Sequence, residues 1–314
     1  MYYPYLRGKQ YELILLRENA ARVRESIVPI IEPVKQAMQG LQRALEALVA
    51  NECRFIVVAN PRCGELADDA QALLDELRRP YLASDPRWRV GCIMDGQTTA
   101  EETQAILELN RETVVIHTGQ GNHGGLLDCL MRDADVRCHV FIEAGTGRLY
   151  RHRFAEGERV LVRDGFIVRP NREHKLKPSE HFSDLHITYP DEGMNGFGDY
   201  LIVGSEFTEA GGPAHAVAIH LTYLQPDEDD DMYVRHYISD RETSPTDPAG
   251  KFAEALAKLV ADVGTAGSLI LRTDAVAEFA QLHERGHYPG LGYVKKLSMQ
   301  HHLELLSQFL SRGN

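Results

Sequence analysis

The sequence has few of the features that mark secreted, membrane-spanning or nucleic-acid-binding proteins. Its five cysteines are an odd number without C-x-x-C spacing, which argues against a disulfide framework or a zinc knuckle. No uncharged apolar run reaches ~18 residues, and the start, MYYPYLRGKQ, lacks the apolar core of a signal peptide. Acidic residues outnumber basic ones by 46 to 34, and the net charge of -12 disfavours unspecific binding to nucleic acid. We therefore expect a cytoplasmic protein that is not bound to a membrane.

What the sequence does contain is a short apolar run that recurs and stops each time on a polar side chain. Six such runs end on Glu32, Asn60, Asp95, His117, Glu143 and Asp164. Stretches with helical periodicity follow the runs, as in the apolar stripe of Met38, Leu41, Leu45 and Leu48. The repeating unit is therefore a β-branched strand, a loop with Gly or Pro, and an amphipathic helix.

This repeat predicts an α/β fold, because strands that are apolar without strict alternation are typical of a parallel sheet covered on both faces. The strands are expected near residues 2–6, 27–32, 55–60, 90–95, 113–117, 138–143, 159–164 and 200–204. Eight units in ~265 residues predict a (β/α)8, TIM-barrel-like architecture. We expect a single barrel domain over 1–314, with an antiparallel β-hairpin inserted at 213–240 and a C-terminal helical extension at 265–314. The connection before the eighth strand is long and polar.

The polar strand ends predict a site, because the carboxyl ends of all strands in such a barrel meet at one mouth. We expect Glu32, Asp95, His117 and Glu143 to share a cavity there as catalytic residues. The three acids would also suit a divalent cation, Mg²⁺ or Mn²⁺. The alternative stays open that these side chains cap helices or bond to neighbouring loops.

The same mouth is expected to carry positive charge. Arg7 and Lys9 follow the first strand, and Arg163 precedes Asp164. Together with Asn60 they are the predicted ligand-binding residues, and guanidinium groups suit a small anionic, phosphate-bearing ligand. Internal salt bridges that only neutralise the acids are the alternative.

Other signals are weaker. His220 and His236 lie on the alternating strands of the predicted hairpin and are expected to be structural. No cysteine has an evident histidine partner and no G-x-S-x-G elbow is present, so nucleophilic catalysis has no local support.

Two stretches, YYPYLRGKQYEL at the start and GFGDY at 196–200, with IVPIIEP between them, resemble the Beta protein family. This family occurs in phages and in bacterial mobile or defence-associated gene neighbourhoods. The positions that match its pattern are Arg7, Lys9, Glu32, Gly198, Asp199 and Tyr200. The resemblance implies a cytoplasmic role in phage–host conflict, with a companion protein encoded nearby, and brings no catalytic residues.

Within GFGDY, Gly198, Asp199 and Tyr200 are expected to be structural, with Asp199 entering the eighth strand and anchoring the loop before it. Two functions remain open. One is a metal-dependent hydrolase, phosphodiesterase-like, acting on an anionic substrate. The other is a non-catalytic sensor or partner scaffold that recognises a phage or host component.

Overall fold

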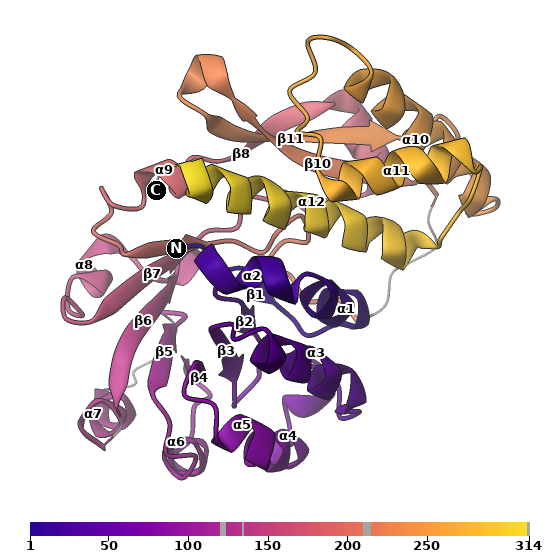
Figure 1. Ribbon diagram of the computed structural model, residues 1–314. Helices are drawn as coiled ribbons and strands as arrows, with labels where there is room; N and C mark the ends of the chain where they lie inside the picture. The colour runs from indigo at the N-terminus through magenta and orange to yellow at the C-terminus, as the bar shows by residue number, and fades with distance from the viewer. Residues whose placement is uncertain (120–123, 134, 210–214, 313–314) are drawn as a thin grey trace. The chain divides into compact units, whose positions relative to one another are not determined.

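The computed structural model describes residues 1–119, 124–133, 135–209 and 215–312. The chain divides into two units (Figure 1). The first comprises Met1–Asp164 and Leu185–Tyr200, and the second comprises Gly165–Asp184 and Leu201–Asn314. No helix in the described ranges combines the length and apolarity needed to cross a bilayer.

The first unit is an eight-stranded, all-parallel barrel, as the sequence predicts. Its strands in sheet order are β1 (Tyr5–Leu6), β2 (Ile30–Ile31), β3 (Phe55–Val58), β4 (Trp88–Met94), β5 (Thr113–His117), β6 (Val136–Ile142), β7 (Glu158–Val162) and β9 (Gly196–Gly198). The N-terminal segment closes the barrel against β9, because the N–H groups of Tyr3 and Tyr5 donate to the carbonyls of Phe197 (2.7 Å) and Asp199 (2.9 Å). Closure removes the exposed edges of an open sheet.

Helices connect most of the barrel strands. They are α1 (Gln10–Glu18), α2 (Ala20–Ser26), α3 (Gln39–Ala50), α4 (Gln71–Leu77), α5 (Pro80–Ala83), α6 (Ala100–Leu107), α7 (Gly124–Asp133), α8 (Arg148–Arg151) and α9 (Leu185–Thr188). Two short 3₁₀ turns, η1 (Gly64–Leu66) and η2 (Glu143–Gly145), follow β3 and β6. The start of α6 is a capping box of Thr99 and Glu102: the Glu102 N–H donates to Thr99 Oγ1 (3.1 Å), and the Thr99 N–H donates to Glu102 Oε2 (2.9 Å).

Alternate residues of each barrel strand face the interior. One core cluster contains Ile30 of β2, Val58 of β3, Ile93 of β4 and Ile116 of β5. Because successive strand residues point to opposite faces, the direction of a side chain at a strand end follows from its spacing to these interior residues. A residue one position after an interior residue faces the outside of the barrel. A residue two positions after it faces the interior again and lies nearer the barrel mouth.

The eighth strand differs from its predicted position. The strand is Gly196–Gly198, whereas residues 200–204 lie beyond its end. The two glycines face Tyr3, and a Cβ atom at Gly198 would lie 2.1 Å from the Tyr3 carbonyl oxygen, so the strand can approach the N-terminal segment only with glycine there. The expected strand was rich in β-branched residues, whereas Gly196–Gly198 contains none. Consequently Asp199 leaves β9 at its carboxyl end and does not enter a strand.

The second unit contains a three-stranded antiparallel sheet of order β10–β11–β8, with β8 (Ser179–Ser183), β10 (Ala218–Gln225) and β11 (Asp231–Ile238). Its helices are α10 (Pro248–Val263), α11 (Asp274–Glu284) and α12 (Leu291–Arg312), and its 3₁₀ turns are η3 (Asn171–Leu176) and η4 (Pro226–Glu228). The predicted hairpin is β10–β11, and only its expected start at 213–214 lies outside the described residues. The long polar connection supplies η3 and β8 to this unit, which periodicity did not indicate.

One face of this sheet forms a second apolar core. Ile219 and Leu221 of β10 pack with Phe252 of α10, Phe279 of α11 and Leu297 of α12. The opposite face carries the intervening residues of each strand, among them His220 and His236.

Candidate functional site

The centre of the site is Glu32, which directly follows β2 and is fully buried. Its Oε2 accepts hydrogen bonds from the Tyr5 hydroxyl (2.8 Å) and from the Arg7 guanidinium. Its Oε1 accepts the backbone N–H of Arg62 (2.7 Å). A buried carboxylate is tolerated because both oxygens are bonded and a cation lies beside it. Arg7 and Glu32, both predicted site residues, therefore form one ion pair, in which Glu32 is fully buried and Arg7 is partly exposed.

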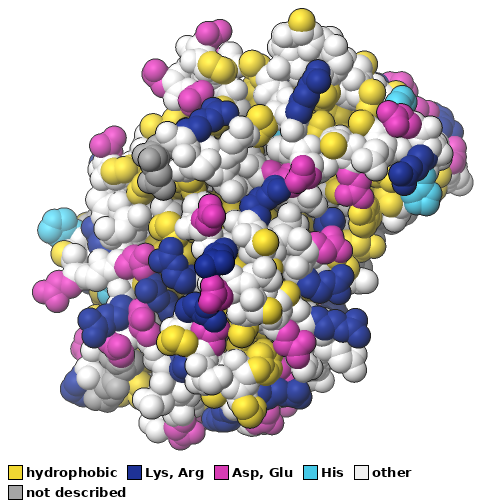
Figure 2. All heavy atoms as spheres, viewed as in Figure 1, with side chains coloured by type: hydrophobic (Ala, Val, Ile, Leu, Met, Phe, Trp, Pro, Cys, Tyr) yellow, Lys and Arg dark blue, Asp and Glu magenta, His cyan; other side chains and the backbone are white. Residues whose placement is uncertain are grey.

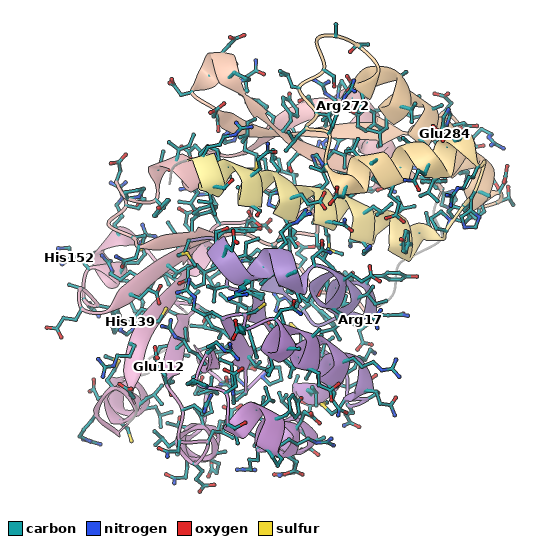
Figure 3. All side chains as sticks on the ribbon, viewed as in Figure 1. Arg17, Glu112, His139, His152, Arg272 and Glu284 are labelled. Carbon is teal, nitrogen blue, oxygen red and sulfur yellow. The ribbon has the colours of Figure 1, made fainter. Side chains whose placement is uncertain are left out.

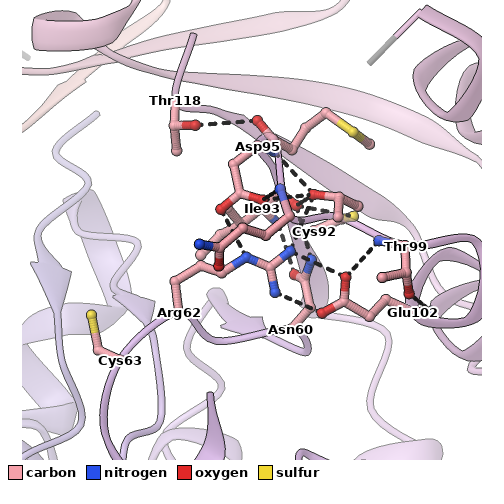
Figure 4. Close-up of polar contacts among 12 residues, drawn as sticks. Asn60, Arg62, Cys63, Cys92, Ile93, Asp95, Thr99, Glu102 and Thr118 are labelled. Atoms are coloured by element: carbon pink, nitrogen blue, oxygen red, sulfur yellow. Dashed lines mark hydrogen bonds and ion pairs between the residues drawn. The ribbon is translucent and has the colours of Figure 1, made fainter. Parts of the chain in front are cut away.

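The side chain of Arg62, in the loop after β3, extends this pair to the next two elements (Figure 4). Its Nε donates to Asp95 Oδ2 (2.8 Å), beyond β4, and its Nη1 donates to Glu102 Oε1 (2.6 Å), in the first turn of α6. Nη2 contacts the Thr98 hydroxyl (3.1 Å) as well. Glu32, Arg62 and Asp95 thus form one charged network across the ends of β2, β3 and β4.

The network compensates the negative charge of Asp95. Burial acts to raise the pKa of this carboxyl, but the hydrogen bond and charge of Arg62 outweigh burial, so that the pKa lies below its ordinary value. The remaining oxygen, Oδ1, accepts the Gln97 N–H (3.0 Å). The acids predicted to hold Mg²⁺ or Mn²⁺ are each paired with an arginine, and within the described ranges Glu32, Asp95 and Glu143 are not among the groups whose ligand atoms converge on one point.

Asn60, predicted to bind ligand, bonds to the neighbouring strand. Its Nδ2 donates to the Ile93 carbonyl (2.8 Å), and its Oδ1 accepts the Ile93 N–H (2.8 Å). The amide side chain therefore acts as one more peptide group in the ladder between β3 and β4. With its side chain used in this way, Asn60 has a structural role.

The Arg7–Glu32 pair has four further groups around it: Lys9, Cys63, Asp164 and Tyr200. The Arg7 guanidinium lies 5.7 Å from the ring centroid of Tyr200 and donates to Cys63 Sγ (3.2 Å). Burial raises the pKa of Tyr200, and the charges of Glu32 and Asp164 add to this rise against the opposing charge of Arg7. Burial and Glu32 likewise raise the pKa of the Cys63 thiol, while the charges of Arg7 and Lys9 act to lower it. We call the set of Arg7, Lys9, Glu32, Arg62, Cys63, Asp95 and Tyr200 the barrel mouth.

His117 belongs to a different cluster. Since Ile116 faces the interior, His117 faces outward, and it is fully buried there. Its Nδ1 contacts the Tyr150 hydroxyl (2.9 Å), and its Nε2 contacts Nδ1 of His139 (3.0 Å), labelled on β6 in Figure 3. Burial, with a smaller effect of Arg159, lowers the pKa of His139 to about 4. The predicted catalytic His117 is therefore a member of an outer aromatic cluster.

A cavity of about 520 Å³ lies beside this outer cluster, near the amino ends of β6 and β7. Val136, His139, Phe154 and Gly157 are among the residues that line it. Barrel enzymes place their chemistry at the opposite, carboxyl ends of the strands.

Glu143 and Arg163 also pair with each other away from the mouth network. Arg163 makes a forked contact to Glu143, with Nε–Oε2 and Nη2–Oε1 distances of 2.7 and 2.9 Å. Each follows, by a single position, a residue that packs on the barrel interior, Ile142 and Val162. Both side chains are partly exposed, and such surface pairs contribute about 0–1 kcal/mol.

Asp199 is buried at the end of β9. Its Oδ1 accepts the hydroxyl hydrogen of Tyr2 (2.6 Å), a residue at the start of the N-terminal segment. The carboxylate therefore links the N-terminal segment to the end of β9. Tyr200 next to it is buried and packs its ring 5.2 Å from that of Tyr5.

Four further residues take part in the site although no sequence pattern indicated them as site residues: Tyr5, Arg62, Cys63 and Glu102. Arg62 follows Asn60-Pro61 in the loop after the third apolar run, so the same strand-end rule would find it if it were extended by two positions. On the face shown in Figure 2, basic and acidic side chains are interspersed, and surface charge alone would not single out the mouth.

Comparison with known proteins adds no assignment: no protein-family model, no curated protein and no solved structure matches this chain.

Proposed function

We propose that the barrel recognises a small anionic, phosphate-bearing ligand at its mouth, with Arg7, Lys9 and Arg62 as the cationic groups. The observation that carries the proposal is the buried Glu32, which accepts a hydrogen bond from Arg7 through one oxygen and one from the Arg62 backbone through the other. A buried ion pair contributes little net stability compared with apolar residues of similar volume. Its presence at the carboxyl ends of barrel strands, where ligand sites are built, favours a functional reason for it.

The fixed positions of the guanidinium groups favour binding. Asp95 and Glu102 hold the Arg62 guanidinium in place, and Glu32 does the same for Arg7. A side chain that is already ordered loses less conformational entropy when a ligand binds. Guanidinium groups also match the geometry of phosphate oxygens.

The same contacts favour recognition over hydrolysis. A general acid or base must be free to exchange a proton with the substrate near neutral pH. Both oxygens of Glu32 accept hydrogen bonds, and the lowered pKa of Asp95 keeps that carboxyl ionised. His117, the predicted acid–base residue, lies in the outer cluster. We therefore favour a sensor over a phosphodiesterase-like hydrolase.

The cellular setting of this proposal comes from the resemblance to the Beta protein family. In that setting the barrel would act in the cytoplasm during phage–host conflict, and a companion protein would respond to the occupied mouth. The ligand would then be an anion whose concentration changes upon infection.

The test is calorimetric titration of the full chain with inorganic pyrophosphate at low and moderate salt. We expect saturable binding that weakens with salt, and affinity at least about tenfold lower in Lys9→Gln and Arg7→Lys. Arg137→Gln is the matched control, because Arg137 is an exposed arginine near the amino end of β6. Equal affinity in all four proteins, or no binding to wild type, would refute the proposal. Release of inorganic phosphate from pyrophosphate would instead support the hydrolase.

A further inference from the structure

A second cluster of polar side chains lies wholly within the second unit. His220 on β10 and His236 on β11 are directly opposite each other, and Glu180 on β8 pairs with Val234 of β11. Residues two positions apart on a strand share a face, so His220, His236 and Glu180 lie on the same face of the sheet. His174 of η3 completes the group, with its ring centroid 4.2 Å from that of His236. We call these four residues the histidine cluster.

Three of these residues present ligand atoms towards a common point. His236 Nε2 lies 3.1 Å and His174 Nδ1 lies 3.6 Å from Glu180 Oε1, and one ligand atom from each residue falls within 4.8 Å of the others. Zinc–nitrogen and zinc–oxygen bonds of ~2.1 Å in a tetrahedron place ligand atoms about 3.4 Å apart. The two distances to Glu180 Oε1, 3.1 and 3.6 Å, are close to this spacing.

The environment of His174 also favours a bound ion. This residue is 1% exposed, and its Nδ1 makes no hydrogen bond to any described residue. A buried polar atom without a hydrogen bond destabilises the folded state. An ion between His174, Glu180 and His236 would satisfy this nitrogen.

The surroundings orient the ligands as outer groups do in known metal sites. Arg169 donates to Glu180 Oε2 (2.8 Å), whereas Glu180 Oε1 is hydrogen-bonded to Nε2 of His236 (3.1 Å), a contact that a bound ion would replace. Nδ1 of His220 lies 2.7 Å from Nδ1 of His236. When His236 donates its Nδ1–H to His220, its Nε2 lone pair is directed at the common point.

The ring of Phe166, whose centroid lies 5.1 Å from that of His220, adds an apolar neighbour.

We propose that His174, Glu180 and His236 bind a divalent first-row transition-metal ion, such as Zn²⁺. Two imidazoles and a carboxylate are a ligand set that these ions prefer over Mg²⁺ or Ca²⁺. Three protein ligands leave a further coordination position for water or a small ligand. The site is independent of the barrel mouth, and the three ligands come from separate stretches of sequence without a recognisable spacing motif.

The test uses the untagged full chain, stripped with a chelator and titrated with Zn²⁺ and with Co²⁺ as a spectroscopic probe. We expect a single ion per chain by elemental analysis, visible absorption bands from the Co²⁺ form, and no competition by Mg²⁺. His174→Gln, Glu180→Gln and His236→Gln are each expected to weaken binding by at least about 100-fold, more than the 10–100-fold typical of outer-group changes. His181→Gln is the matched control, because His181 is a neighbouring, exposed histidine of β8.

Circular dichroism of the metal-free variants distinguishes loss of the metal site from loss of the fold. If a ligand variant fails to fold, Arg169→Gln and His220→Gln replace it, with an expected 10–100-fold weakening. The proposal is overturned if wild type binds no Zn²⁺ stoichiometrically. It is equally overturned if the folded ligand variants bind as tightly as His181→Gln.

Discussion

Gly198 illustrates how closely two barrel strands approach at a single residue. The Tyr3 carbonyl oxygen occupies the space into which a Cβ atom at this position would extend, and Val162 packs there as well. Backbone atoms cannot rotate away as a flexible side chain can. The identity of this residue is therefore fixed by the closure of the barrel and not by a ligand.

We predict that Gly198→Ala lowers the free energy of unfolding by on the order of 3 kcal/mol, because the added methyl group forces β9 away from the N-terminal segment. Urea denaturation followed by circular dichroism measures this loss. Gly125→Ala is the control: Gly125 lies in α7, where an added Cβ meets no atom within 4 Å, and helix propensity favours alanine there. Equal stability of Gly198→Ala and wild type would contradict the closure described here.

Side-chain direction also explains which site residues the sequence could predict. Glu32 and His117 both end apolar strands, and the pattern treats them alike. Counting from the interior residues Ile30 and Ile116 shows that Glu32 continues inward, whereas His117 faces outward. This count can be made only when the interior face of each strand is already known. In strands that are apolar on both faces, the sequence alone contains no such information.

At the scale of elements, Arg62 connects a loop to the start of a helix. Glu102 closes the capping box of α6 with Oε2 and accepts the Arg62 guanidinium with both oxygens. The loop after β3, the loop after β4 and the first turn of α6 are therefore held by one side chain. The capping box was visible as a four-residue motif, but the contact to Arg62 spans 40 residues and had no local signal.

We predict that Arg62→Met destabilises the fold by roughly 2–3 kcal/mol, somewhat less than the 3–5 kcal/mol of a fully buried pair because the site is partly exposed. Hydrogen exchange should also be faster for the first-turn amides of α6. Arg78→Met, which removes an exposed arginine with ion-pair distances of 3.7 Å, should cost less than ~1 kcal/mol. Equal stabilities of the two variants would contradict the proposed role of Arg62 in linking the loops after β3 and β4 to α6.

The eighth strand marks the limit of prediction at this scale. Seven strands overlap their expected positions, and six of them, β2 to β7, were predictable because they lie in apolar runs with β-branched residues, whereas β1 is Tyr5–Leu6. The eighth is the triplet Gly-Phe-Gly, and the chain leaves the barrel before it to build β8 and η3. The periodicity of a single segment does not indicate which strands that segment pairs with.

At the scale of the whole molecule, both units contain histidines that are stable only when neutral. Burial lowers the pKa of His139, in the barrel, and of His301, in α12, to about 4 each. His301 Nε2 donates to the Thr222 carbonyl (2.8 Å), and Nδ1 faces the Thr273 hydroxyl (2.9 Å). Neither ring has an acid beside it among these contacts to stabilise a second proton.

We therefore predict that the protein loses stability as the pH falls from about 6.5 to 5. In this window the unfolded chain binds protons that the native state rejects, so the free energy of unfolding decreases as the pH falls. Each unit of pKa depression corresponds to about 1.4 kcal/mol at full effect. Urea titrations at pH 7 and pH 5 measure the slope, and His139→Gln should make it shallower. A stability that is constant over this range would contradict the neutral, buried state of these rings.

The central claim is that the pair of Arg7 and the buried Glu32 serves anion recognition and not stability. The direct measurement is the calorimetric affinity of the Arg7→Met/Glu32→Met double variant for inorganic pyrophosphate, made beside its thermal unfolding. Replacing both charges leaves no buried ion unpaired, whereas the Tyr5 hydroxyl and the Arg62 N–H lose their acceptor, so the double variant should be folded and more stable than the Arg7→Met single variant. We predict a folded protein with no saturable pyrophosphate binding. A double variant that binds pyrophosphate as tightly as wild type would contradict the account, because the barrel mouth would then not be the site.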